Sequence, residues 1–584
     1  MLARELGERG RVALDEAFAP GLDAAEAFRL ARAHGAARRE RRTDRLGVER
    51  AHQLADVLAL AREPGTAGDT ACLAQRGGEL IGDAERGELL LGQRDQLLAE
   101  VLGGVRGALA RTLARALVGV VVGVVCSAHR GCYTTTMPSS SELAGAGQLA
   151  DLVSLTLQEA RRQGATQCEA DASVSRGLSV NVRLGEVDTV EYQRDRGLAV
   201  TVYFGKRKGS ASTADLGRAA LIDTVAKACA IARYTAEDPY AGLIEPEALA
   251  RDIPDLDLDH PWDLAPERAI ELARDCEAAG LAVDARVANS EGASVGSQRY
   301  SGMYGNSLGF LGGYSATSHS VSCSLIAEQG EEMQRDHWYS VARDAADLED
   351  AASIGRLAGE RALARLGARR LTTRKAPVAF TPDMARGLIG HFLGAVRGTA
   401  QYRKASFLLD AAATQVFPAF VQMHERPHLL KALASSPFDQ EGAATRDREL
   451  VRDGVLDGYV LGSYSARRLG LKTTGNAGGI HNLLVAASDG GLNAADFLAR
   501  LDTGLLVTEL MGQGVNGVTG DYSRGASGFW VEGGAIQYPV HEVTIAGNLK
   551  RMYLDIAALG ADTDVRGAVR APSILISELT IAGE

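Results

Sequence analysis

The spacing of apolar residues predicts that helices alternate with extended stretches along most of this chain. Residues 143–164 carry apolar side chains at helical spacing and close on Gly164, a residue that commonly stops a helix. Residues 168–213 instead alternate apolar and polar side chains between glycines, as half-buried antiparallel strands do. Residues 216–234 return to helical spacing. The pattern therefore predicts a first α/β unit.

The chain downstream continues this alternation, without a repeat of fixed period. Residues 266–280 and 344–366 are predicted helices, and the Ser- and Gly-rich stretch between them is strand-like up to about residue 328. A strand predicted at residues 376–380 opens the last domain. The expected domains are residues 143–238, 239–372 and 373–584, with a linker at residues 239–254.

Residues 1–136 differ in composition from the rest of the chain. They are rich in Ala, Arg, Gly and Leu, and they contain no Lys, Asn or Trp. One interpretation is an additional helical domain. The other is that Met137 is the true start and that the upstream stretch is an over-extended reading frame, poorly ordered if it is made. Because coherent domain signals begin just after Met137, we expect the second interpretation.

Composition and charge restrict the class of protein. Of 584 residues, 46% are hydrophobic and 23% are charged, as in a globular protein with two to four domains. A formal net charge of -11 repels phosphate backbones, so nucleic acid is not an expected partner. The longest apolar run, residues 116–126, is shorter than the roughly 20 residues that a membrane helix needs. Seven cysteines without a CxxC pair are typical of reduced thiols, so we expect a cytoplasmic protein without a membrane segment.

The segment from His424 to His428 matches HExxH, the pattern of many zinc peptidases. Such a site needs both imidazoles on one face of a continuous helix. Pro427 disfavours helical backbone at the residue before it, so we expect a helix that begins near Pro427 and leaves His424 upstream. His424 and His428 are therefore weak candidates for metal ligands.

Two glycine-rich stretches and one acidic stretch are further candidates. Residues 512–517 match GxGxxG, but the sequence that follows is strand-like, whereas a dinucleotide site requires a helix there. Residues 471–482 lack the order of a P-loop, although their backbone N–H groups could hold a carboxylate or a peptide. Asp439, Glu441 and Glu449 lie among turn residues, where we expect a solvated hairpin, with a paired-carboxylate site as the alternative.

The most distinctive segments of the chain lie in its C-terminal third. They are YRKASFLLD (402–410), SSPFDQEG (435–442), SYSARRLGLKTTGNAGGIHN (463–482), TELMGQGVNGVTGDYSRGASGFWVEGGAIQYPV (508–540) and TIAGNL (544–549). Together they resemble the TldD/PmbA metallopeptidase family, and within it the PmbA (TldE) type of subunit. The resemblance extends from about residue 143 to the C-terminus. It implies an α+β fold, with an N-terminal mixed α/β region followed by a larger β-rich C-terminal domain.

The resemblance also bears on the metal. TldD-type subunits carry HExxxH on a helix, and a later Cys completes their zinc site. On the helix expected after residue 380, this chain has Arg386 at the first His position, Gly387 at the Glu position, and only His391 retained. No Cys follows Cys323. The resemblance thus implies no catalytic residue and no confident metal ligand on this chain, and it implies zinc on a TldD-like partner.

For function, the resemblance implies one subunit of a heterodimeric peptidase that cleaves unfolded or precursor peptides. Gly-rich edge strands in the stretch that starts at Thr508 and ends at Val540 are candidate peptide-binding elements, because a peptide can add to a sheet edge. Two alternatives stay open. One is an autonomous metallopeptidase that uses its own His residues, and the other is a non-proteolytic regulatory binding protein that acts on an enzyme such as a gyrase.

Overall fold

The computed structural model describes residues 145–583. The predictions for residues 1–136 and for Met137 as the start lie outside these residues, as do the apolar run at 116–126 and three of the seven cysteines. The other four cysteines are buried and unpaired, as the prediction of reduced thiols requires. Within the described part of the chain, no helix is both long and apolar enough to cross a membrane.

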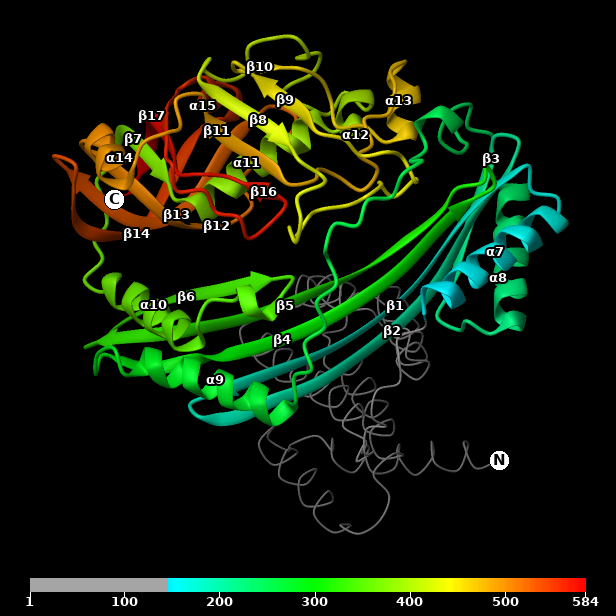
Figure 1. Cartoon of the computed structure of the whole chain (residues 1–584). Coiled ribbons are helices and arrows are strands. Elements are labelled where there is room, and N and C mark those ends of the chain that lie inside the picture. The colour runs from blue at the N-terminus through cyan, green and yellow to red at the C-terminus, as the bar shows by residue number, and fades with distance from the viewer. Residues whose placement is uncertain (1–144, 584) are drawn as a thin grey trace, which may run out of the picture. The chain divides into compact units, whose positions relative to one another are not determined.

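A six-stranded antiparallel sheet forms the first half of the described chain. Its strand order is β3-β2-β1-β4-β5-β6, and its long strands curve along their length (Figure 1). Apart from Arg176, the even-numbered residues of β1, such as Ala170 and Val180, are buried, whereas odd-numbered residues such as Glu169 lie on the opposite face. The strands are β1 (Gln167–Arg183), β2 (Glu186–Phe204), β3 (Arg207–Thr213), β4 (Val287–Asn306), β5 (Leu311–Gln329) and β6 (Glu332–Ala342).

Two pairs of helices cover the apolar face of this sheet. The helices α7 (Ala146–Arg162) and α8 (Arg218–Tyr234) pack on one end, and α9 (Pro266–Leu281) and α10 (Ala351–Ala364) pack on the other (Figure 1). The four predicted helices are thus confirmed, although α10 begins only after Asp350, whose carboxylate accepts a hydrogen bond from the Ser353 N–H. The segments 143–238 and 239–372 both contribute strands to this one sheet, and their division into two domains stays a prediction.

A second half is built around a closed sheet. The strand order is β14-β13-β12-β7-β17-β15, and an additional pairing of β14 with β17 closes the ring. The mixed α+β fold class is therefore confirmed. The strands are β7 (Arg374–Phe380), β12 (Gly504–Met511), β13 (Asp521–Glu532), β14 (Ala535–Asn548), β15 (Ile556–Leu559) and β17 (Ile574–Ala582).

The helix α11 (Pro382–Val396) follows β7 directly and buries one side in the core of this second half. Its Phe392 packs edge to face on Phe417, with ring centroids 5.0 Å apart, and Phe417 in turn contacts Tyr553.

A five-stranded sheet adds β8 (Val421–Glu425), β9 (Arg448–Arg452), β10 (Val455–Leu456), β11 (Leu483–Ala487) and β16 (Val569–Arg570). The short helices are α12 (Gly398–Tyr402), α13 (Ser463–Leu469), α14 (Ala494–Leu501) and α15 (Leu549–Leu554).

Arginines join the two halves at separate places. Arg467 of α13 donates hydrogen bonds to the carbonyl oxygens of Tyr240, Gly242 and Leu243, at 2.8, 2.9 and 3.0 Å. Arg343, which follows β6, donates to the Leu433 carbonyl oxygen at 2.6 Å. Because a guanidinium offers five donors in a fixed plane, one side chain can tie several backbone carbonyls together.

The contact between α9 and α10 gives a direct test of the packing. A Cβ atom at Gly355 would lie 1.7 Å from the Cys276 carbonyl oxygen, whereas a Cβ atom at Gly387 of α11 would meet nothing within 4 Å. We predict that Gly355→Ala lowers the free energy of unfolding by about 2–3 kcal/mol, because the helices must move apart. The matched variant Gly387→Ala should raise it by about 0.5–1 kcal/mol through helix propensity. Urea unfolding of both full-length variants measures the difference, and equal effects would show that the helices are not in close contact.

Candidate functional site

The α11 helix carries the residues at which a metal site was considered. Arg386 points to the first half of the chain, where its Nη2 donates to the Tyr339 hydroxyl at 3.0 Å and its Nη1 donates to the Arg566 carbonyl oxygen at 3.0 Å. Its guanidinium also lies 3.4 Å from the buried Asp564 carboxylate. Arg386 is therefore a bridge between α11, β6 and the segment before β16.

The residues of α11 do not fit a zinc ion. Arg386 is a permanent cation whose two terminal nitrogens donate hydrogen bonds within the chain, and Gly387 has no side chain to act as a base. His391 packs edge to face on Tyr522, with ring centroids 6.1 Å apart. Burial, followed by the nearby Arg524, lowers the pKa of His391, so the ring is neutral near pH 7. One imidazole on this face cannot hold a metal alone, and no group of three or more potential ligands occurs among the described residues.

His424 and His428 do not share a helix. His424 lies on β8, with Nδ1 3.9 Å from a Glu449 carboxylate oxygen, and His428 lies in the turns that follow, where Nε2 is 2.9 Å from the Thr445 hydroxyl. The prediction of a helix starting at Pro427 is wrong. The chain forms consecutive turns there, and Lys431 has a φ of 56°, which a helix does not tolerate.

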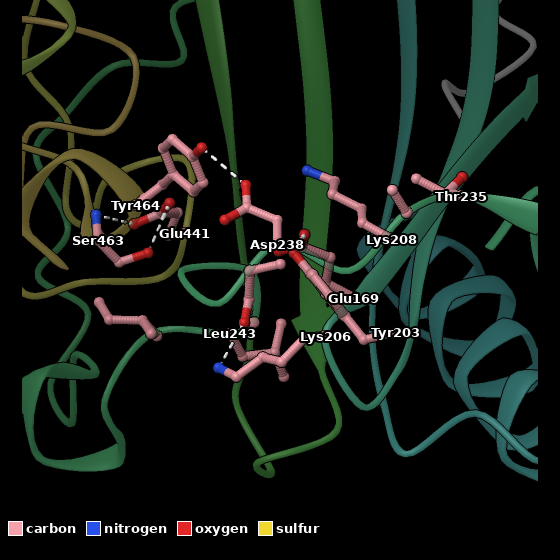
Figure 2. Close-up of a pocket in the computed structure, with 14 residues that line it drawn as sticks. Glu169, Tyr203, Lys206, Lys208, Thr235, Asp238, Leu243, Glu441, Ser463 and Tyr464 are labelled. Carbon is pink, nitrogen blue, oxygen red and sulfur yellow. Dashed lines mark hydrogen bonds between the residues drawn. The ribbon is translucent and has the colours of Figure 1, made fainter. Parts of the chain in front are cut away.

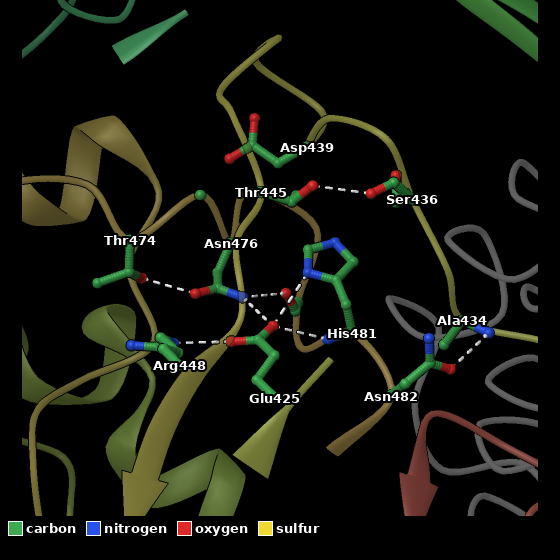
Figure 3. Close-up of polar contacts among 12 residues, drawn as sticks. Glu425, Ala434, Ser436, Asp439, Thr445, Arg448, Thr474, Asn476, His481 and Asn482 are labelled. Carbon is green, nitrogen blue, oxygen red and sulfur yellow. Dashed lines mark hydrogen bonds and ion pairs between the residues drawn. The ribbon is translucent and has the colours of Figure 1, made fainter. Parts of the chain in front are cut away.

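The Glu between these two histidines is the centre of a buried polar cluster (Figure 3). One oxygen of Glu425 accepts hydrogen bonds from the Asn476 amide at 2.6 Å, the His481 N–H at 2.8 Å and the His481 ring at 3.0 Å. The other oxygen accepts from Arg448 Nε at 2.7 Å. The side chain is only 2% exposed, so every one of these donors replaces water.

The donors decide the charge of Glu425. Burial opposes ionisation, but the His481 and Arg448 contacts outweigh it and hold the pKa of Glu425 below its ordinary value. The carboxylate is therefore ionised at neutral pH and fixes the Gly-rich segment of Asn476 and His481 against β8 and β9. This is a structural role rather than that of a general base beside a metal.

The acidic stretch differs from the solvated hairpin that was expected for it. Asp439 is buried, and its two oxygens accept hydrogen bonds from the N–H groups of Glu441, Ala443 and Ala477, at 2.8, 2.9 and 2.9 Å. Burial raises the pKa of both Asp439 and Glu441. The prediction was wrong because the Gly-rich segment after α13 folds over this turn and excludes water.

The stretch from Thr508 to Val540 contains one strand that is paired on both sides and one strand whose end is unpaired on one side. The strand β13 is internal, with β12 and β14 on either side. β12 pairs with β7 only over Leu505, Leu506 and Val507, which leaves residues 508–511 without a strand on that side. The Thr508 hydroxyl there is buried without a hydrogen-bond partner. The GxGxxG stretch, residues 512–517, leads into β13 rather than into a helix, as predicted. The assignment of this region to peptide binding stays a prediction.

Sequence reasoning missed the cluster around Glu425. The sequence of residues 471–482 indicates only a possible anion-binding turn, whereas the structure shows that this segment wraps around a carboxylate of the chain itself. The signal that was present is the combination of glycines with Asn476 and His481. Its partner, Glu425, is about fifty residues away, and no local pattern links the two.

Comparisons with known proteins agree on one family. Models described as the PmbA/TldA metallopeptidase domain 1, central domain and C-terminal domain match residues 168–232, 259–366 and 373–583. The chain is 49% identical over 430 residues to the metalloprotease PmbA of Escherichia coli, covering 74% of this chain and 94% of that protein.

Solved structures have the same fold. A protein of Bacteroides thetaiotaomicron, described as a proposed modulator of DNA gyrase, superposes with a TM-score of 0.71 at 27% identity, covering 76% of this chain and all of that one. TldE from Thermococcus kodakarensis gives a TM-score of 0.66 at 20% identity, covering 74% of this chain and all of that one, and supports the fold alone.

Glu425 gives a pH-dependent prediction. Because its pKa is lowered on folding, its contribution to stability is complete above the ordinary Glu pKa of about 4.3 and is lost as the pH falls through the lowered value. We predict that Glu425→Gln lowers the free energy of unfolding by about 3 kcal/mol at pH 7, since Arg448 is left buried without its counter-charge.

The difference between wild type and Glu425→Gln should shrink as the pH is lowered below the ordinary Glu pKa. Chemical unfolding at a series of pH values measures this difference, and Glu247→Gln, at an exposed position, is the control. A difference that does not change with pH would contradict the ionised state of Glu425.

Proposed function

The chain belongs to the PmbA/TldD metallopeptidase family, and from this we propose that it is the PmbA-type (TldE-type) subunit of a two-subunit zinc peptidase whose metal is held by a TldD-like partner. The observation that carries the proposal is that α11 lacks the first ligand and the base of the HExxxH pattern. Arg386 and Gly387 stand where the family resemblance places a ligand and a base, and Arg386 is committed to Tyr339, Arg566 and Asp564.

The contribution of this chain is then to hold the peptide and to complete the assembly. The unpaired side of β12 at residues 508–511 lies just beyond its pairing with β7, next to the start of α11. An extended peptide added there would form main-chain hydrogen bonds without a demand on its sequence, which suits unfolded or precursor peptides. Most backbone groups of a folded protein are already paired within its own helices and sheets, so this mode of binding supports the choice of unfolded or precursor peptides.

Two further features support a cytoplasmic location and a partner subunit. The four cysteines of the described residues are buried and unpaired, which suits the reducing cytoplasm. The exposed face of α11 carries Gly387, Gly390 and Gly394, and a Cβ atom at any of these positions would meet nothing within 4 Å. A partner subunit can approach the helix backbone closely on this face.

The test compares the full-length chain alone, a TldD-like partner alone, and their mixture, with an unfolded peptide as substrate. We predict cleavage by the mixture and at most trace cleavage by either chain alone. Changing His391, His424 and His428 of this chain to Ala should leave cleavage by the mixture within about threefold of wild type, because these side chains do not hold the metal. A threefold change corresponds to a shift in activation free energy of under about 1 kcal/mol.

A substrate with alternate backbone nitrogens methylated serves as the control for strand addition. It should be cleaved much more slowly, because it cannot complete the main-chain hydrogen bonds. Cleavage by this chain alone that is abolished by the triple His→Ala change would contradict the proposed division of roles.

A further inference from the structure

A cavity of about 360 Å³ lies where the first half of the chain meets the second (Figure 2). Its walls come from β1, β2 and the turn into β3, from the linker at residues 235–244, and from the C-terminal residues Glu441, Ser463 and Tyr464. The volume is within the range of roughly 300–1,000 Å³ that small-molecule sites occupy. This cavity is separate from α11 and from the Glu425 cluster, and the peptidase chemistry discussed above does not use it.

Three carboxylates line the cavity, and each is held in place by neutral donors. Glu169 accepts hydrogen bonds from the Tyr203 and Tyr304 hydroxyls at 3.0 and 2.9 Å. Glu441 accepts from the N–H and the hydroxyl of Ser463 at 2.8 and 3.0 Å. These contacts fix the positions of the two carboxylates from opposite halves of the chain. They bring no positive charge.

The third carboxylate, that of Asp238, accepts hydrogen bonds from the Tyr464 hydroxyl at 2.7 Å and from the Tyr240 N–H at 3.0 Å. Among residues 145–583, none of the three cavity carboxylates forms an ion pair. The cavity therefore contains fixed carboxylates that make no ion pair, although the charges of Arg468 and Lys206 help to lower the pKa of Asp238.

The surroundings of Glu441 oppose its ionisation. Burial is the main reason that the pKa of Glu441 is raised, and the carboxylates of Asp439 and Glu169 add to it, against the lowering effect of Ser463. The pKa values of Tyr203 and Tyr304 are raised by burial and by the same two glutamates. A positive group placed between Glu169 and Glu441 would relieve this repulsion.

The lining of the cavity also includes the amines of Lys206 and Lys208. Lys206 donates to the Ala241 carbonyl oxygen at 2.8 Å. Lys208 is exposed, with its Nζ 5.9 Å from the centre of the Tyr203 ring, and in the part of the chain that the structure describes it makes no ion pair. Fixed carboxylates and a Lys that is not ion-paired thus border the same space (Figure 2).

We propose that this cavity binds a short peptide with free ends, with its ammonium group at Glu169 and Glu441 and its carboxylate at Lys208. The choice of a peptide among compounds with both charges rests on the proposed function, since such peptides are what a peptidase releases. The cavity then serves as a binding site for short products, separate from the site where the substrate peptide is cleaved.

Isothermal titration calorimetry of the full-length chain, without a partner subunit, tests this with trialanine, N-acetyl-trialanine, trialanine amide and alanine. Trialanine should bind, and each blocked form should bind at least about tenfold more weakly, because one charged contact is lost. Equal binding of the acetylated form, or no binding of trialanine at millimolar concentration, would overturn the proposal. Equal binding of alanine would overturn the assignment to peptides.

Variants assign the two ends of the ligand. Glu441→Gln and Glu169→Gln should each weaken trialanine by about tenfold or more, and Lys208→Met should remove the preference for trialanine over its amide. Lys227→Met, which changes an exposed Lys of α8 paired with Asp223, should leave binding unchanged. Thermal unfolding confirms that each variant is folded.

Because binding is measured in the isolated chain, its outcome is independent of whether the mixture with a TldD-like partner is active. Unchanged binding in both folded glutamate variants would overturn the assignment of the ammonium site.

Discussion

The contacts of the Arg386 guanidinium link the two halves of this chain at the position where the family resemblance places a metal ligand. From α11 it reaches a hydroxyl on β6, a backbone carbonyl before β16, and the Asp564 carboxylate. Arg566, which supplies that carbonyl, lies over the Trp338 ring with its guanidinium carbon 4.1 Å from the centroid. The position that would hold a metal ligand in a TldD-type subunit thus fastens the two halves of the chain together. A cation fixed there repels a second cation, which supports the proposal that a partner holds the zinc ion.

Two carboxylates of opposite character, the buried Glu425 and the half-buried Glu441, lie in the second half. Glu425 has Arg448 beside it and a lowered pKa, and it acts as a fixed negative centre for the Gly-rich segment. Glu441 has neighbouring carboxylates and a raised pKa, and it faces a cavity. The same physical rule separates their roles, because a buried charge is stable only where donors or a counter-charge replace water. The charge of Glu425 is compensated within the chain, whereas Glu441 is suited to a ligand with a positive charge.

The sequence predicted the helices and strands of the first half well, because α7 to α10 and β1 to β3 show their periodicity directly and only one face of each is buried. It predicted less of the second half, where segments distant in the sequence meet in a closed sheet and long loops carry the polar clusters. The failed helix after Pro427 shows the reason. Its residues have helical spacing, but Lys431 donates its N–H to the Leu256 carbonyl oxygen and takes up a left-handed backbone. Likewise, the sequence around Asp439 is typical of a solvated turn, but in the structure the segment around Ala477 covers this residue.

We infer that residues 145–583 of this chain do not hold the metal of the peptidase. The most direct measurement is the zinc content of the isolated full-length chain, determined by mass spectrometry of the metal after gel filtration in zinc-containing buffer. We expect far less than one zinc ion per chain, because Arg386 and Gly387 supply no ligand and His391 is alone on its helix face. One zinc ion per chain, lost when His391 is changed to Ala, would contradict it.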